Sequence, residues 1–482
     1  MVIRTRSSTA RTLANALCIL GGEAFSRLAT LIIAVVVARW FGSTALGQYG
    51  FALAFASIVL LVPDLGLNLL VTRDLAARPE SLRPIFWGVH WLKFCLLATV
   101  AISTFLVGEN FVHDSGRRTL IYILVGRALL QAFSQVYMAV FKAFETMQYI
   151  ALQQLTNAVL VILAVGLALG LKANLPAVVA ATLLGQVAET WLGWHLVRRR
   201  FSPGAFCGWD SRFLFAMLAA ALPVGITSIL QALNLRIDIL ILGIFASNDE
   251  LGRFQAAAWF AVGTFLAASL LMAVLFPKLS RLLSGPEAQG SAYVTSLMRH
   301  AVPCLAAGSL LVWLVAPQGI VWLFGPKLAA AAPLLRILAA AIPFTFLNTV
   351  LFYVFVAARR RRVYLTALGI GSAVGAAASA YLAWRFGAAG SAFACLIREF
   401  LITVIFLYAL KRAAIAPQLG MTLLKISLAA LGVTLAAGTR LGLGGSWGDW
   451  PAAGSLLLLV GSLVFVGWPN RRELLLLAGE GA

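Results

Sequence analysis

Five arginines lie inside apolar stretches that are long enough to cross a membrane: Arg27, Arg127, Arg236, Arg336 and Arg398. A guanidinium stays charged in proteins and can donate two parallel hydrogen bonds to a phosphate or carboxylate. Inserting such a group near the bilayer centre costs at least about 2.5–3.5 kcal/mol, so each arginine is expected to face a cavity or a partner. The arginines therefore predict an anion-binding region within a membrane.

Carboxylates occur in the same apolar stretches. Glu23 precedes Arg27 by four residues, which places both on one helix face, either as a local ion pair or as part of a binding site. Glu23 and Asp238 are the candidate ion-coupling residues, because a carboxylate in a poorly solvated cavity can exchange protons near neutral pH. Glu189 is expected to be structural, and Asp64 is expected to mark a helix joint.

The composition indicates that lipid is the main solvent of the chain. Of the 482 residues, 61% are hydrophobic and 11% are charged, compared with about 45–50% and about 25% in soluble domains. Apolar windows of the length a bilayer requires recur along the whole chain. They predict an all-α polytopic membrane bundle with about 14 transmembrane helices, at residues 13–38, 44–71, 86–108, 119–141, 149–170, 175–197, 213–243, 251–276, 298–324, 329–357, 363–386, 388–410, 420–438 and 452–468.

The basic residues predict an orientation. If both termini are cytoplasmic, 24 of the 37 lysines and arginines fall on cytoplasmic segments, a set that includes Lys93, and eight fall on the outer side. This bias follows the positive-inside rule. Orientation in the membrane therefore explains the net charge of +20, and no nucleic-acid partner is expected.

A weak internal repeat divides the chain. Arg27 and Arg236 are 209 residues apart, as are Arg127 and Arg336, which places each pair on corresponding helices of two halves. Repeated halves around a central site are common in transporters. We expect two pseudo-repeated six-helix lobes, at residues 1–200 and 201–412, followed by two additional spans within residues 413–482.

The sequence offers no metal or cofactor site. The five cysteines are scattered, without a CxxC or Cys/His spacing, and the four histidines fall near the ends of spans or in loops. We expect no metal, no cofactor and no catalytic constellation. The longest outer loop, residues 109–118, is too short to carry the catalytic groups expected of a membrane polymerase or ligase.

Several short stretches, taken together in their order and spacing, carry a resemblance to a known family. They are Ala38-Arg39-Trp40-Phe41-Gly42, Leu46-Gly47-Gln48-Tyr49-Gly50, Pro63-Asp64-Leu65-Gly66-Leu67, Arg73-Asp74-Leu75-Ala76, residues 235–243, Leu323-Phe324-Gly325-Pro326 and residues 387–392. Over essentially its whole length, the sequence resembles the polysaccharide-export flippases of the multidrug/oligosaccharidyl-lipid/polysaccharide (MOP) exporter superfamily.

The resemblance implies two six-helix lobes around a cavity that opens alternately to each side of the cytoplasmic (inner) membrane. It also implies a lipid-linked oligosaccharide carried on polyprenyl pyrophosphate, H⁺ or Na⁺ as a coupling ion, and other polysaccharide assembly proteins as partners. Arg27 and Arg236 would lie on opposite cavity walls and hold the pyrophosphate. The full set of expected substrate-binding residues is Arg27, Arg236, Arg127, Arg398, Gln48, Asn68, Gln231 and Asn234.

Two other functions stay open from the sequence. An ion-coupled multidrug or toxin extruder of the same superfamily would have a smaller and more acidic cavity, whereas five arginines within the spans favour an anionic substrate. A membrane polymerase or ligase acting on the same lipid intermediates ranks third. We therefore expect a transporter and not an enzyme.

Overall fold

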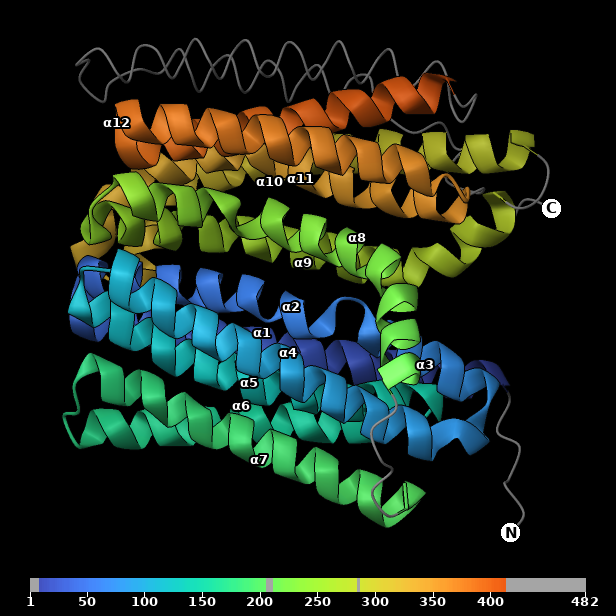
Figure 1. Cartoon of the computed structure of the whole chain (residues 1–482). Helices are drawn as coiled ribbons and strands as arrows, with labels where there is room; N and C mark the ends of the chain where they lie inside the picture. The colour runs from blue at the N-terminus through green and yellow to red at the C-terminus, as the bar shows by residue number, and fades with distance from the viewer. Residues whose placement is uncertain (1–7, 205–210, 284–286, 413–482) are drawn as a thin grey trace. The chain divides into compact units, whose positions relative to one another are not determined.

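The computed structural model describes residues 8–204, 211–283 and 287–412, in which every regular element is a helix. A helix satisfies all of its backbone hydrogen bonds internally, as a segment in lipid must. Figure 1 shows the α-helices in chain order. They are α1 (Ser8–Val59), α2 (Leu61–Asp64), α3 (Leu67–Ala77), α4 (Leu82–Phe111), α5 (Ser115–Ala143), α6 (Met147–Gly170), α7 (Leu175–Phe201), α8 (Ser211–Phe245), α9 (Asn248–Leu283), α10 (Glu287–Phe324), α11 (Ala332–Ala357) and α12 (Arg361–Arg412), with 3₁₀ turns at Pro79–Ser81 and Pro326–Ala331.

Two of these helices each contain two predicted spans joined by a glycine corner. In α1 the corner is Gly42, with φ 87° and ψ −173°, and in α12 it is Gly387, with φ 56° and ψ −135°. Residues with a Cβ rarely adopt these conformations, so glycine is required where a helix turns back without a loop. The predicted boundaries between spans 13–38 and 44–71, and between 363–386 and 388–410, are confirmed.

A third break interrupts the second span. α2 ends at Asp64, and the next two residues, Leu65 and Gly66, have φ values of 36° and 85°. Pro63 cannot donate a backbone hydrogen bond, which weakens the helix at this point. The expectation that Asp64 marks a helix joint is confirmed.

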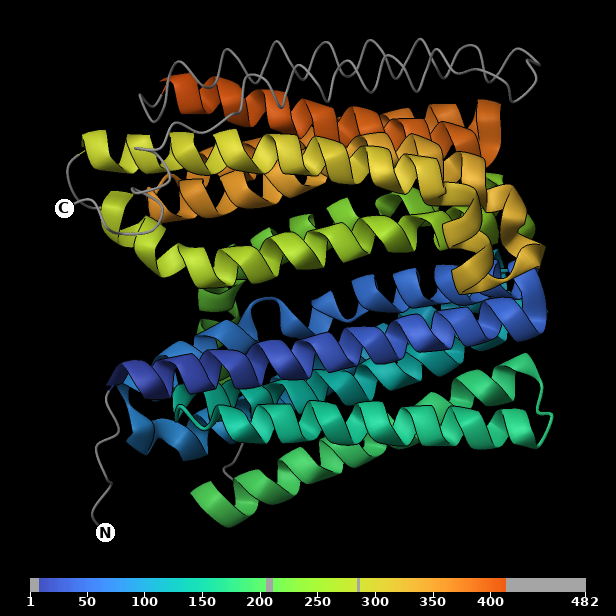
Figure 2. The same cartoon turned by 180° about the vertical axis from the view of Figure 1, so that it is seen from behind.

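The chain divides at Arg236, within α8, into two compact units. In the first unit, α7 packs against α5 and α6, and α1 packs against the same two helices. In the second, α11 packs against α9, α10 and α12 (Figure 2). The lobes at residues 1–200 and 201–412 stay a prediction, and the two spans expected within 413–482 lie outside the described residues.

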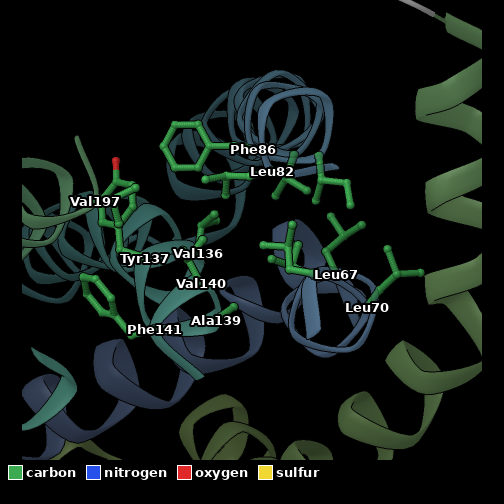
Figure 3. Packing of buried hydrophobic residues seen from close by; sticks show 14 of the residues in the cluster. Leu67, Leu70, Leu82, Phe86, Val136, Tyr137, Ala139, Val140, Phe141 and Val197 are labelled. Atoms are coloured by element: carbon green, nitrogen blue, oxygen red, sulfur yellow. The ribbon is translucent and has the colours of Figure 1, made fainter. Parts of the chain in front are cut away.

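Side chains from several helices interlock in the core of the first unit. Leu67 and Leu70 of α3, Phe86 of α4, and Val140 and Phe141 of α5 are buried in one cluster. Figure 3 shows these side chains pointing toward one another between the helices. The cluster fixes the position of α3 immediately after the break at Leu65 and Gly66.

The outer surface of the helices is apolar. Phe105, Leu163, Trp322 and Trp384 are large hydrophobic side chains that stay exposed, which in water would favour aggregation but in lipid is the normal condition. Eight helical stretches within the described residues are long and apolar enough to cross a membrane. The chain is a multi-pass membrane protein, and fourteen spans and cytoplasmic termini stay predictions.

Candidate functional site

Glu23 and Arg27 form an ion pair on α1. Arg27 Nη2 donates to Glu23 Oε1 at 2.7 Å, and Nε donates to the same oxygen at 3.3 Å. The side chains are 38% and 46% exposed for Arg27 and Glu23 respectively, so the pair is accessible. Because a guanidinium has five N–H donors, Arg27 can hold Glu23 and still donate to a second anion.

Two other arginines of the first unit have no anionic partner. Arg127 on α5 and Arg236 on α8 are half-buried, and neither makes a hydrogen bond or an ion pair with any residue the structure describes. Both lie within electrostatic range of the buried Tyr49 hydroxyl, and Arg236 is also within range of Arg27. Among the described residues, one of these three arginines, Arg27, is therefore in an ion pair, with Glu23, while Glu189 acts on Arg127 from beyond ion-pair distance.

The second unit contains the opposite balance of charge. Arg398 on α12 is buried and is paired with Asp238 on α8, while its Nη2 lies 3.4 Å from Glu399 Oε1 and 3.4 Å from Cys395 Sγ. One cation thus serves two buried carboxylates. Arg398 was expected to bind substrate and Asp238 to bind a coupling ion, and the structure pairs these two residues with each other; both roles stay predictions.

Neutral groups complete this cluster. Asn348 Nδ2 on α11 donates to Glu399 Oε2 at 3.0 Å, and Thr403 Oγ donates to Asn348 Oδ1 at 2.8 Å. Gly375, on the same helix as Arg398, leaves room for the arginine stem, because a Cβ there would lie 2.7 Å from Arg398 Cδ. The cluster therefore holds Arg398 in one position.

Glu189 on α7 lies in a cluster of neutral donors. Ser134 Oγ donates to Oε1 at 2.9 Å, Gln186 Nε2 donates to Oε2 at 3.1 Å, and Asn157 Nδ2 also donates to Oε2. The residue is 4% exposed. Among the described residues, no lysine, arginine or histidine lies within ion-pair distance of it, although Arg127 acts on it electrostatically.

Lys93 is buried within a predicted span. It was counted among the cytoplasmic charges, but it lies inside α4 with its side chain fully buried. Its Nζ donates to Asn68 Oδ1 at 3.0 Å and to Ala132 O at 2.9 Å, and lies 3.9 Å from Asp64 Oδ1. Lys93 is therefore a buried structural link between α4, α5 and the break after α2, and the side of the membrane to which it belongs stays a prediction.

The polar residues expected to contact the saccharide have different surroundings. Gln48 Nε2 donates to Asp114 Oδ2 at 3.0 Å, and Asp114 is the N-cap residue of α5. Asn68 accepts from Lys93 and donates to Gln135 Oε1 at 3.1 Å. Gln231 and Asn234 are half-buried on α8. Sugar binding by these residues stays a prediction.

The polar residues that surround the charges were not among the predicted site residues. Ser134, Gln186 and Asn157 in the first unit, and Asn348 and Thr403 in the second, are neutral and occur singly on different helices. A uniform search for uncharged polar residues within the predicted spans would have found them, but not their grouping. Among the described residues, no group of three histidine, cysteine or acidic side chains could hold a metal ion.

Comparison with known proteins identifies related sequences and folds. The family model described as "Polysaccharide biosynthesis protein" matches residues 12–283, which is more than half of the chain. No curated protein matches the chain. A solved structure described as a lipid II flippase MurJ in an inward closed conformation has a TM-score of 0.68 at 14% identity, covering 92% of this chain and 96% of that one.

Two further solved structures belong to transporters. An inward-facing multidrug resistance MATE family transporter of the MOP superfamily has a TM-score of 0.64 at 16% identity, covering 83% of this chain and 99% of that chain. A MOP superfamily transporter from Pyrococcus furiosus has a TM-score of 0.55 at 13% identity, covering 84% and 95%. At these identities the likeness establishes a common fold.

Proposed function

We propose that the chain transports a saccharide substrate, on the basis of its family. It belongs to the polysaccharide biosynthesis protein family, within the MOP superfamily of membrane flippases and transporters. Its cargo is a saccharide unit attached to polyprenyl pyrophosphate. It moves this unit across the cytoplasmic membrane by alternating access, for the assembly of a surface polysaccharide. Other polysaccharide assembly proteins receive the product.

The observation that carries this proposal is the excess of cations in the first unit. Arg127 and Arg236 form no ion pair with any described residue, and Arg27 shares its charge with the accessible Glu23. Isolated charges within membrane helices are expensive unless they face a cavity or a partner. A pyrophosphate with two or more negative charges is a ligand that would compensate them.

Arginine is better suited to this ligand than lysine. A guanidinium presents a planar pair of N–H donors that matches two phosphate oxygens, whereas an ammonium presents a point charge. Charge-assisted hydrogen bonds contribute about 1.5–3 kcal/mol each. Replacing Arg127 or Arg236 by lysine should therefore weaken pyrophosphate binding by about 10- to 150-fold if one such bond is lost.

Coupling to an ion gradient is part of the same proposal. Glu23 and Asp238 are the carboxylates assigned to H⁺ or Na⁺, and each is paired with an arginine, Arg27 and Arg398 respectively. An ion would have to compete with the guanidinium for the carboxylate. Coupling at these residues would therefore require the pair to separate during the transport cycle.

The test is complementation of surface polysaccharide export in a strain that lacks this protein. Arg27→Lys, Arg127→Lys and Arg236→Lys should each lower export, and the alanine variants should lower it further. Arg336→Lys is the matched control, because Arg336 is also an arginine within a span but lies over the Trp313 ring at 4.8 Å. That control should keep most of its export.

The amount of each variant in the membrane is measured in parallel. Full export by an Arg127→Ala, Arg236→Ala double variant present at normal levels would contradict binding of the pyrophosphate by these arginines. It would favour recognition of the sugars by hydrogen bonds from Gln231 and Asn234. Export that fails only with reduced membrane levels would instead assign these arginines to folding and contradict the proposal in the same way.

A further inference from the structure

The surroundings of Glu189 differ from those of an ordinary buried ion pair. Its three donors come from α5, α6 and α7, and all three are neutral. Gly185 and Gly193, one turn before and after it, let the neighbouring helices approach: a Cβ at Gly185 would lie 2.8 Å from Asn157 O, and one at Gly193 would lie 2.6 Å from Tyr137 Cδ2. The packing therefore builds a closed polar cradle around one carboxyl group.

The chemistry of the cradle suits two protonation states. A carboxylate accepts hydrogen bonds only, whereas a protonated carboxyl also needs an acceptor for its O–H. Serine, asparagine and glutamine each carry both a donor and an acceptor, so rotation of their terminal groups can satisfy Glu189 in either state. Arginine or lysine partners have donors only and would suit the ionised state alone.

The residue of the second unit that corresponds to Glu189 in the repeat is a base and not an acid. Arg398 follows Glu189 by 209 residues, the same offset that relates Arg27 to Arg236. There, the arginine is a permanent cation for Asp238 and Glu399. The first unit has an acid, Glu189, at this position, and among the described residues no lysine or arginine lies within ion-pair distance of it. A proton is therefore the cation that can neutralise Glu189.

Arg127 connects this carboxyl to the candidate substrate site. It precedes Ser134 by seven residues on α5, which is two helical turns or roughly 10 Å along the same face. It acts electrostatically on Glu189 and on Tyr49, and its Nε is buried without a hydrogen-bond partner. The charge on Glu189 therefore changes the electrostatic potential at Arg127.

We propose that Glu189 is a proton-binding site whose charge state sets the affinity of Arg127 for an anion. The inference rests on the proposed function, because it takes the anion to be the pyrophosphate of the substrate. When Glu189 is ionised, its negative charge partly offsets that of Arg127 and weakens anion binding. When Glu189 is protonated, binding is strengthened. By reciprocity, the bound anion favours uptake of a proton from water at Glu189.

Other titratable groups lie on the helices packed against α7. They are Arg117, Arg118, Tyr122, Arg127, Tyr137 and Lys142 on α5, Tyr149 on α6, and Arg11, Cys18, Glu23, Arg27, Arg39 and Tyr49 on α1, while α7 itself carries His195 and the terminal arginines Arg198, Arg199 and Arg200. Pyrophosphate also changes its charge with pH. The test must therefore compare variants at each pH, so that contributions common to both proteins cancel.

The experiment measures the Kd of inorganic pyrophosphate for the full chain in lipid nanodiscs, from about pH 5.5 to about pH 8.5. Glu189→Gln mimics the protonated residue. The ratio of the wild-type Kd to the variant Kd should be close to one at acid pH and should rise to about tenfold at alkaline pH, as expected for unit charges about 10 Å apart in a protein. Glu109→Gln is the control, because Glu109 is an exposed carboxylate on α4 that pairs with Arg118; this variant should retain the pH dependence that Glu189 gives the wild type.

A ratio that does not change with pH would overturn the inference about Glu189 while leaving pyrophosphate binding intact. Failure of the wild type to bind pyrophosphate at every pH would overturn the proposed function together with this inference. A second measurement needs the wild type alone and so does not depend on how well Glu189→Gln folds: calorimetry in buffers of different ionisation enthalpy gives the protons taken up when pyrophosphate binds. At alkaline pH, where Glu189 is ionised before binding, the wild type should take up protons beyond those that pyrophosphate itself exchanges, and no such excess would overturn the inference.

Discussion

Gly375→Ala tests the position of Arg398 with the smallest change the chain allows. Alanine is favoured over glycine in a helix interior by about 0.5–1 kcal/mol. At this position, however, the new Cβ would lie 2.7, 2.8 and 3.0 Å from Cδ, Cγ and Cβ of Arg398. Overpacking of this kind costs about 1–3 kcal/mol. If Arg398 also moves away from its carboxylates, part of the 3–5 kcal/mol cost of breaking a buried pair is added.

We therefore expect Gly375→Ala to lower the free energy of unfolding by about 1–4 kcal/mol, measured by titration with a denaturing detergent. Gly369→Ala is the matched control on the same helix, because a Cβ there meets nothing within 4 Å. It should be neutral or slightly stabilising. Equal stabilities of the two variants would refute the proposed packing of Arg398. In an Arg398→Ala background, the cost of Gly375→Ala should fall, because the two nearest overlapping atoms, Cδ and Cγ, are gone and only the contact with Cβ remains.

Two further predictions use the same unfolding measurement. Lys93→Met should destabilise the protein by about 1–3 kcal/mol, because Asn68 loses a buried hydrogen-bond donor. The control is Lys142→Met at an exposed lysine, which should change the free energy of unfolding by less than about 0.5 kcal/mol. Equal effects of the two substitutions would contradict the buried role of Lys93. Gly42→Ala should lower the free energy of unfolding by about 1–3 kcal/mol through backbone strain alone, since no atom lies within 4 Å of the position of the new Cβ. The control is Gly126→Ala, within a regular helix and equally uncrowded, which should not lower it. If Gly42→Ala had no effect, the backbone conformation of the corner would not be fixed.

The positions of the helices followed from the sequence because the bilayer imposes a simple rule. Apolar runs of membrane length, ended by glycine, proline or charge, matched the described helices, and the corners at Gly42 and Gly387 fell where one predicted span met the next. The same rule did not predict the burial of Lys93. This charge lies within the predicted span 86–108 and was counted with the cytoplasmic charges, whereas the hydrogen bonds that permit its burial come from residues distant in sequence.

The pairing of charges was the least predictable property. Glu399 adjoins Arg398 and projects about 100° away from it on a helix, so the sequence alone does not indicate a contact between them. The arginine side chain is long enough to reach Glu399 and also Asp238, which is 160 residues away. The repeat between Glu189 and Arg398 was hidden as well, because an acid in one half corresponds to a base in the other.

The corners at Gly42 and Gly387 also make the chain intolerant of inserted residues at these positions. With no loop between the two helices of each hairpin, one inserted residue would rotate the following helix by about 100° and advance it by about 1.5 Å. Every side chain of that helix would then face a different neighbour, so a single insertion would be equivalent to redesigning a whole helix surface. Affinity tags and fluorescent labels are better placed in the connection at residues 171–174, where the chain leaves α6 before α7 begins.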